Sequence, residues 1–469
     1  MILHITKREL YDNLNSLRFA LTTLLLLALM LTNAIGHLRE HPNRVQTYNA
    51  AVAESLELLS SHADEGLYKL AQQGPGKLYK KPSLLHFCAE GGERLLPNII
   101  KGDSPYVYST GIIGVWQLSY PDVNIDRKRV GPDVTKVDWA FITAYVLSLI
   151  ALLFTFDSIS GERESGTLRL ILSNSVPRHR ILIGKFLGAL ISVSIPFTLA
   201  ALLNLLIIST SSAVHLNIEA WGRLGIIFFI SLLYTCFFLA LGLLVSARVQ
   251  RSAVSLVILL LIWVTFVVFM PSTVASRASE LSPSMSFGEK WTQYSQMREE
   301  IWDRYNYVAW SKKVDRNTLT AKSAFFTEKA EMAERLNQEY LTSQIAQVQH
   351  ARSITQISPA TLLQYLLESF AGTGFARHLQ FVENAERYAR EYRGFVVDMD
   401  RSDPESLHII GVREGMTEKK VLPAAVPKFE DTLSLSKDFN DSAMEILLLT
   451  MFVVVLLSGA YLAFVRVEI

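Results

Sequence analysis

Apolar residues are gathered into six blocks along this chain, and polar stretches of very unequal length separate the blocks. Each block holds about 18 to 26 residues, close to the ~20 residues that an α-helix needs to cross the hydrocarbon core of a membrane. The pattern predicts an α-helical polytopic membrane protein with six transmembrane helices. The predicted spans cover residues 19–36, 138–156, 186–208, 222–247, 253–271 and 444–465.

Two polar stretches, residues 37–137 and 272–443, are long enough to form domains of their own. In the first stretch we expect helices, which the run Gly74-Pro75-Gly76 interrupts. Short β-like runs follow at Tyr106–Tyr108 and Ile112–Leu118. We therefore expect the first stretch to form a small mixed α/β unit.

The second polar stretch predicts long helices over Met297–Gln349, which is charged and largely free of glycine and proline. Apolar residues recur there every three or four positions and predict a stripe that packs inside the domain rather than a ligand site. The stripe consists of Phe326, Ala330, Ala333, Leu336 and Tyr340. Further helices are expected at Ala360–Phe370 and Phe375–Tyr392, on either side of a turn at residues 371–374.

Residues 1–18 place leucines at roughly helical spacing among charged residues that include Lys7, Arg8 and Glu9. This arrangement predicts an amphipathic helix that lies at the cytoplasmic surface of the membrane and leads into the first span. The alternative is a signal peptide with a cleavage site near Ala34–Gly36. The length and helical spacing of the segment before the apolar run favour the interfacial helix.

Lysine and arginine are unevenly distributed among the short loops. They occur in residues 1–18, 157–185, 248–252 and 466–469, whereas the loop 209–221 carries none. The positive-inside rule then predicts that both termini, the 157–185 segment and the 248–252 turn lie in the cytoplasm. With six spans, both large polar domains lie on the extracytoplasmic side.

The segment 157–185 carries most of the charge found in the short loops. Acidic and basic residues alternate at its start, and its cationic end precedes the next span. Thr167–Leu172 predicts a short amphipathic helix with Leu168 on its apolar side, and Ser165 or Thr167 as its cap. One interpretation is a solvated loop that only follows the positive-inside rule. The other is a lever that receives force from a cytoplasmic partner.

The order of residues in this segment resembles the type 2 ABC exporter permeases, the ABC-2 family. The run E-R-E-x-G-T-L-x-x-x-L is followed by a proline, basic residues and G-K at the start of the next span. The resemblance implies that the segment contains the coupling helix, which sits in a groove of an ATPase subunit that the N-terminal helix also borders. The implied coupling residues are Asp157, Gly161, Glu162, Arg163, Glu164, Gly166, Thr167, Leu168, Leu172, Pro177, Gly184 and Lys185.

The same resemblance implies a role for the charges and for the leucines. Glu162, Arg163 and Glu164 would dock by charge against the ATPase subunit. Leu168 and Leu172 would fill its groove.

A second set of residues resembles a subgroup of these permeases with two large extracytoplasmic domains, which we expect here to be mainly helical. It combines S-P-A at Ser358–Ala360, A-G-T-G at residues 371–374 and F-x-x-x-A-x-x-Y shortly after His378. Lys81–Leu85 and Gly91–Pro97 in the first domain are similar to that subgroup as well. The substrates of the subgroup are mostly unassigned, so the substrate-binding residues stay unknown.

The sequence contains no P-loop motif G-x-x-x-x-G-K-[ST], so we expect no cofactor in this chain, and ATP and Mg would be bound by the partner ATPase. No zinc-protease or serine-hydrolase motif occurs, and the ten histidines are scattered. We therefore assign no catalytic residue and no metal site. The net charge of +1 gives no reason to expect nucleic-acid binding.

The two cysteines exclude a disulfide scaffold within one chain, because Cys236 lies in an apolar block and Cys88 in a polar stretch. A bridge between Cys88 residues of two copies stays open.

The resemblance also implies partners and a location. We expect two ATPase subunits per complex, a second permease chain that is identical or related, and the lipid bilayer of a bacterial cytoplasmic (inner) membrane. The first hypothesis is ATP-driven export of an unidentified substrate. The alternative is a mechanical coupler whose outer domains act on an envelope or periplasmic partner without transport. A membrane scaffold or receptor is a third class, which no feature favours. Spans that are almost free of charge argue against an ion-driven transporter.

Overall fold

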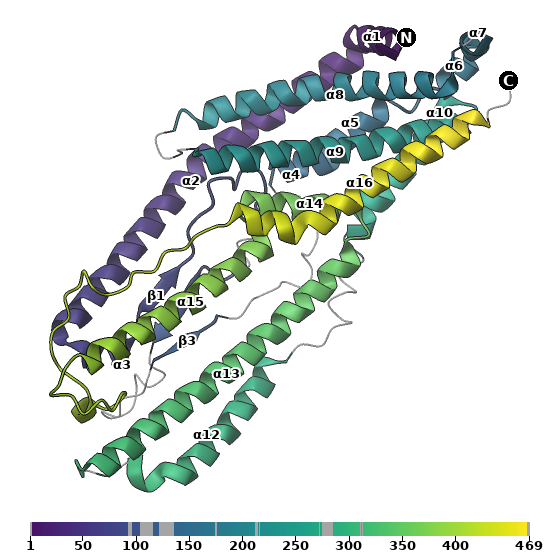
Figure 1. The fold of residues 1–469 in the computed structure, drawn as a ribbon. Helices are drawn as coiled ribbons and strands as arrows, with labels where there is room; N and C mark the ends of the chain where they lie inside the picture. Colours follow the sequence, from purple (N-terminus) through teal and green to yellow (C-terminus); the bar gives the residue numbers. More distant parts are fainter. Residues whose placement is uncertain are drawn as a thin grey trace.

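The computed structural model describes residues 2–91, 96–103, 116–121, 136–173, 176–211, 214, 216–271, 273, 285–309, 311 and 313–466, without the side chains of residues 171, 172 and 306–309. The molecule is elongated, and its two ends are built from different helices and strands (Figure 1). One end, here called the terminal end, holds both chain ends and the helices α1 (Ile2–Leu14), α6 (Ser160–Glu164) and α7 (Thr167–Ser173). The opposite part, here called the distal body, is formed by a small β-sheet and the helices α3 (Leu67–Gln73), α12 (Phe287–Ala309), α13 (Arg316–Thr355) and α15 (Gly374–Arg401).

Within the part of the chain that the structure describes, five helices are long and apolar enough to cross a membrane, which confirms a mostly helical, multi-pass membrane protein. They are α2 (Leu17–Glu65), α8 (Arg178–Ile208), α9 (Ile218–Arg248), the continuous pair α10 (Ser252–Trp263) and η3 (Val264–Phe269), and α16 (Leu435–Val465).

The sixth predicted span, residues 138–156, coincides with a shorter apolar helix. Its three parts are α4 (Trp139–Phe141), the π-helix η2 (Ile142–Leu147) and α5 (Ser148–Leu153). Fifteen residues rise only about 22 Å, less than the ~30 Å hydrocarbon core. This segment therefore does not meet the length of a span, although it lies among the helices that do.

The first predicted span and the helix after it are one element. We expected a boundary near residue 36, but α2 runs unbroken for 49 residues and continues through Pro42. It starts where Ser16 Oγ accepts a hydrogen bond from Phe19 N, and it ends at Gly66, whose φ is +122°. A helix of this length covers about 73 Å, so α2 reaches from the bundle into the distal body.

Other helices extend several residues past the predicted spans into polar sequence. Arg178 already begins α8, so Gly184 and Lys185 lie on a helix rather than in a loop. Asn217 Oδ1 caps Ala220 N and starts α9 four residues earlier than expected. The first turns of α16 likewise precede its apolar block. Side-chain caps, Asn217 for α9 and Ser434 for α16, mark where these two helices begin, whereas Pro177 precedes α8 without such a cap.

The bundle core combines close aromatic packing with a small polar network. Phe197 of α8 stacks on Phe228 of α9 with ring centroids 5.2 Å apart. Asn204 of α8, which is fully buried, donates to Met30 O at 2.7 Å and to Asn33 Oδ1 at 2.9 Å on α2. Buried amides in a membrane bundle must be paired within the protein, so this network fixes how α2 and α8 sit against each other.

The first polar stretch contains the predicted mixed α/β unit. Its antiparallel sheet has the order β1 (Gly76–Tyr79), β2 (Ile99–Asp103) and β3 (Gln117–Ser119). Leu78, Ile100 and Leu118 are buried in one core that α3 and α15 share. The expected β-like run Tyr106–Tyr108, and Ile112–Leu118 up to residue 115, lie outside the described residues.

The second polar stretch forms the long helices that its composition predicts, α12 and α13. In the predicted stripe on α13, four members are buried and Ala330 is half-buried, which confirms the packing interpretation. After it come α14 (Pro359–Ala371), a left-handed turn at Gly372, and α15. The short 3-10 helix η4 (Arg413–Gly415) lies in the segment that connects α15 to α16, and this segment contains no β-strand.

The two polar stretches pack on each other as one body. The Trp116 ring meets Tyr392 edge-on at 5.4 Å, and Tyr392 Oη donates to Leu70 O at 3.1 Å. Arg377 of α15 is paired with Asp431, and both side chains are almost completely buried. These contacts join segments separated by up to about 320 residues, so the distal body folds as a unit.

A buried ion pair attaches the distal body to the bundle. Arg223 of α9 donates to Asp438 Oδ2 of α16 at 2.6 Å and to Phe370 O of α14 at 3.3 Å. Asp438 also accepts a hydrogen bond from Gln380 of α15. Arg223 and Asp438 are 4% and 2% exposed. Elements of the bundle and of the distal body therefore meet at this pair.

Candidate functional site

Lys185 lies at the centre of the residues expected to couple the chain to a partner. Its Nζ is 2.7 Å from Glu9 Oε1 on α1 and 2.8 Å from Glu162 Oε1 on α6. The lysine is 4% exposed, and a buried ammonium group needs opposite charge to offset its lost hydration. This triad ties α1, α6 and α8 together, although sequence reasoning had assigned Glu162 to an external contact.

Helix α1 lies closely against α8 because glycines remove side chains from the contact. A Cβ added at Gly184 would lie 2.7 Å from Ile5 Cγ2, and one at Gly188 would lie 2.6 Å from Glu9 Cβ. Thr6 Oγ1 donates to Gly184 O at 3.3 Å across the same contact. Small residues allow such close approach of helices, so the G-x-x-x-G pair holds the N-terminal helix.

The leucines of α1 point the other way. Leu3 and Leu14 are 80% and 38% exposed, although they belong to the apolar stripe that the sequence places on one side of the segment. Lys7 and Arg8 are also exposed, and Arg8 pairs only loosely with Asp12 at 3.9 Å. A helix with polar residues against the protein and leucines facing outward has the character of an interfacial helix.

Charged residues of the segment 157–185 bind helix ends within the chain. Arg163 donates to Ala247 O at 3.3 Å and to Val249 O at 3.2 Å, at the C-terminal end of α9. Glu164 Oε2 accepts from Ser252 N and Oγ at the first turn of α10, and these hydrogen bonds lower the pKa of Glu164. Cations at helix C-termini and anions at N-termini are the favourable arrangement.

The two ends of the segment are anchored in the same way. Asp157 pairs with Arg18 at 2.9 Å and so joins the end of α5 to the start of α2. Pro177 precedes α8, and Arg178 donates to Phe464 O at 3.0 Å and to Val465 O at 2.6 Å at the C-terminal end of α16. The segment is thus connected to helices from every part of the bundle, which sequence reasoning did not find.

The short helix α7 is reached through Gly166, whose φ of +77° favours glycine. The predicted helix Thr167–Leu172 is therefore present, as Thr167–Ser173. Leu168 is 5% exposed and packs with Ile181 and Phe464, so it fills a core of this chain and not a groove of a partner.

Leu170 is instead 69% exposed on α7. The side chain of Leu172 lies outside the described residues, and Gly161 follows the first residue of α6. In Figure 1, α6 and α7 stand at the outer edge of the terminal end, beside the chain ends. The exposed residues of α7, which include Arg169, Leu170 and Ser173, therefore lie at the terminal end, while Leu168 holds the helix to the bundle.

Other candidate groups are packing residues. Cys88 is fully buried, and burial, with a smaller effect of Asp138, raises the pKa of its thiol. A bridge between Cys88 residues of two copies is therefore excluded in this fold, because the sulfur does not reach the surface. His378 is buried on α15. Among the described residues, no group of three His, Cys, Asp or Glu side chains is arranged to hold a metal ion.

Comparisons with known proteins agree with this geometry. The family model described as "ABC-2 family transporter protein" matches residues 3–468. The "Probable ABC transporter permease protein NosY" of Pseudomonas aeruginosa is 37% identical over 131 residues, which are 27% of this chain and 46% of that protein. The protein of the same name from Stutzerimonas stutzeri is 34% identical over 132 residues, with the same coverage.

The "Probable multidrug ABC transporter permease YbhS" of Escherichia coli is 25% identical over 180 residues, which are 36% of this chain and 44% of that protein. The chain thus spans about half the length of these relatives. Because the family model matches almost from end to end, the chain belongs to the ABC-2 family of transporter proteins, as a multi-pass permease.

Proposed function

We propose that this chain couples ATP hydrolysis by two separate ATPase subunits to the export of a substrate that is not yet identified. The observation that carries the proposal is the buried triad of Lys185, Glu9 and Glu162. It makes the N-terminal helix, the coupling segment and α8 one mechanical unit at the end of the bundle where α7 is exposed. ATP and Mg would be bound by the partner subunits.

The route of force follows from the contacts of the segment. A push on α7 would pass through Gly166 to α6, and from α6 to the ends of α9 and α10, which Arg163 and Glu164 hold. The relevant coupling residues then act in two ways. Leu170 and its exposed neighbour Arg169 face the partner, and the charged residues keep the lever attached to the bundle.

We further propose that the protein lies in a bacterial cytoplasmic membrane with six spans, counting Trp139–Leu153 as the sixth. Both termini and the segment 157–185 would then be cytoplasmic, and the distal body extracytoplasmic, as in the subgroup with two large outer domains. Support comes from the positive-inside pattern and from the position of both chain ends at the terminal end. A second permease chain, identical or related, would complete the translocation path.

Leu170→Asp tests the coupling role. We expect the purified variant to fold normally, since the side chain is exposed, and to lose both binding and stimulation of the ATPase subunits. The matched control is Leu422→Asp, because Leu422 is also strongly exposed but its neighbours Val421 and Val426 are buried in the core of the distal body. Full ATPase stimulation by the Leu170→Asp variant would contradict the proposal.

Cysteine labelling tests the orientation. Ser173 on α7 and Ser402 after α15 are both exposed serines. A membrane-impermeant maleimide applied to intact spheroplasts is expected to label Ser402→Cys and to spare Ser173→Cys until the membrane is opened. The reverse labelling pattern would place the coupling segment on the extracytoplasmic side and contradict the proposed orientation.

The second candidate function is the mechanical coupler that carries no substrate across the membrane. It is favoured by the rigid connection of the bundle to the distal body through α2 and the Arg223–Asp438 pair.

None of the described residues between 287 and 355 belongs to the bundle core. Replacing 287–355 by a short linker should leave substrate efflux largely intact in an exporter. A coupler would lose its envelope phenotype completely, with ATPase stimulation intact in both cases.

A further inference from the structure

Two neighbouring cavities lie along α2, between this helix and the loops around residues 79–90 and 136–138. The smaller cavity holds about 280 Å³ and begins at Thr32 and Asn33, at the end of the apolar part of α2. The larger one holds about 830 Å³ and continues along α2 as far as Ala51. Together they are about as large as the pockets in which proteins bind small organic molecules.

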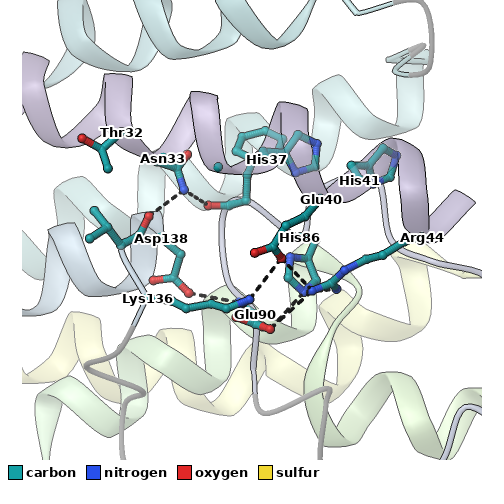
Figure 2. Close-up of a pocket in the computed structure, with 13 residues that line it drawn as sticks. Thr32, Asn33, His37, Glu40, His41, Arg44, His86, Glu90, Lys136 and Asp138 are labelled. Carbon is teal, nitrogen blue, oxygen red and sulfur yellow. Dashed lines mark hydrogen bonds and ion pairs between the residues drawn. The ribbon is translucent and has the colours of Figure 1, made fainter.

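The two cavities adjoin, because they share three lining residues, Glu40, Arg44 and His86. Arg44 NH1 donates to His86 Nε2 at 2.7 Å in the wall between them (Figure 2). Burial first, and then the charge of Arg44, lower the pKa of His86 far below its usual value, so the ring accepts this hydrogen bond as a neutral group.

The smaller cavity contains two buried imidazoles whose outer nitrogens are unused. His37 and His41 stack with ring centroids 4.7 Å apart, one helical turn apart on α2 (Figure 2). Nε2 of each ring is buried and has no hydrogen-bond partner among the described residues. His41 is 2% exposed. Because buried polar atoms are nearly always paired, two unpaired nitrogens in a cavity point to a polar ligand.

The charges of the smaller cavity are compensated within the protein. Lys136 Nζ lies 2.5 Å from Glu90 Oε2, and Arg44 NH2 lies 3.1 Å from Glu40 Oε2. Asp138 accepts from the backbone N of Phe141 at 2.7 Å. The smaller cavity therefore offers hydrogen bonds more than net charge.

The larger cavity is cationic. Arg39, Arg44 and Lys80 line it against one carboxylate, that of Glu40. Arginine recognises phosphate and carboxylate groups through two parallel hydrogen bonds. The phenol rings of Tyr48 and Tyr79 add apolar surface with a polar edge to the same walls. This lining suits an anion that is part of a larger organic molecule.

At its end near Thr32, the site opens onto the apolar surface of α2. Thr32 and Gly36 line the smaller cavity and are exposed. Seven and eleven residues before Thr32, on the same side of the helix by its 3.6-residue period, Leu25 and Leu21 are 46% and 57% exposed. An amphiphile bound in the cavities would therefore leave its hydrocarbon part against these leucines, within the bilayer.

We propose that the two cavities are one binding site for a lipid with an anionic headgroup. Arg39 and Arg44 bind the anionic group, His37 and His41 bind the polar remainder of the head, and the acyl chains lie along Leu21 and Leu25. The inference does not depend on the coupling to an ATPase. Binding is measured on the purified full chain without partner subunits, so it fails or succeeds separately from the proposed function.

The test is equilibrium binding of fluorescently labelled phosphatidylglycerol to the detergent-solubilised full chain, followed by anisotropy. Unlabelled phosphatidylglycerol is expected to compete at least about tenfold better than phosphatidylcholine. It is also expected to outcompete glycerol 3-phosphate, which carries the anionic head alone. Equal competition by phosphatidylcholine would overturn anion recognition. Equal competition by glycerol 3-phosphate would show a soluble anion as ligand and overturn the lipid assignment.

Two variants locate the binding in the cavities. Arg39→Glu reverses an exposed charge at the cavity and should weaken binding about tenfold or more. Ala51→Trp fills the larger cavity without changing charge and should weaken it to a similar degree. The matched controls, Arg335→Glu on α13 and Ala50→Trp on α2, change exposed residues outside both cavities and should bind normally. Normal binding by both cavity variants, or equal losses in the controls, would overturn the proposal.

Discussion

Lys185 and Glu162 are 23 residues apart in the sequence, and their Nζ and Oε1 atoms are 2.8 Å apart in the fold. The pair links helix α8 to the segment 157–185, which we propose couples the chain to an ATPase subunit. Glu162, which the sequence had assigned to a contact with a partner, thus holds the segment 157–185 to the bundle. The distinction changes what a mutation at either position is expected to do.

Lys185→Met should destabilise the protein by roughly 3 kcal/mol, because it leaves the carboxylates of Glu9 and Glu162 together without their buried counter-ion. The measurement is thermal unfolding in detergent, alongside ATPase stimulation. Lys7→Met removes an exposed lysine from α1 and should leave the thermal unfolding unchanged. Adding Glu9→Gln and Glu162→Gln to Lys185→Met should restore part of the stability. A single variant as stable as the parent would refute a buried triad.

Gly188→Ala should loosen α1 from α8, because the new Cβ would lie 2.6 Å from Glu9 Cβ. Overpacking of this kind costs about 1–3 kcal/mol. Asn13 Nδ2 and Ser192 Oγ lie 3.1 Å apart across the contact, so an Asn13→Cys/Ser192→Cys pair reports it by disulfide yield. The yield should fall with Gly188→Ala. Gly225→Ala, where nothing lies within 4 Å of the added carbon, should leave it unchanged.

Arg223→Met should cost roughly 3 kcal/mol, because Asp438 would remain buried without its partner. Replacing both residues, as Arg223→Met with Asp438→Leu, should recover most of that loss, as double-mutant analysis of a buried pair requires. Chemical unfolding of the four proteins in the cycle measures the coupling. Arg401→Met is the control, since Arg401 is 74% exposed. If the double variant were as unstable as the sum of the singles, the pair would not be the joint between bundle and distal body.

Acidification should destabilise the distal body. Burial, and then the charge of Lys80, lower the pKa of His378 from 6.5 to about 4. The unfolded chain therefore binds a proton between those values that the folded chain does not. Stability is constant above pH 6.5 and falls as the pH drops toward 4, by at most roughly 3 kcal/mol for this group.

The check is the pH dependence of unfolding between pH 7 and 4. His378→Gln should flatten part of the slope. His179→Gln, at an exposed histidine of α8, should keep it. An unchanged slope in His378→Gln would show that this ring does not titrate on unfolding.

Hydropathy and periodicity predicted the helical membrane class, five of the six spans as long apolar helices, and the buried stripe on α13. The sixth predicted span, residues 138–156, is a shorter apolar helix in the structure and stays a prediction. The continuous helix α2 was missed, since an apolar block ends where side chains turn polar and a helix ends only where its backbone hydrogen bonds do. The coupling motif was visible as a pattern of residue types. The actual contacts of Glu162, Arg163 and Glu164 were not.

The order of residues by itself determined the class of protein, the short helix at Thr167–Ser173 within the polar segment 157–185, and the absence of a P-loop motif. These follow from local pattern, because hydropathy, helical spacing and short motifs act over a few turns of chain. Only the tertiary structure decided that Lys185 and its carboxylates are internal, that Leu168 is core while Leu170 is exposed, and that two cavities line α2. Such relationships join segments distant in sequence, and the burial that gives them their strength exists only once those segments have packed.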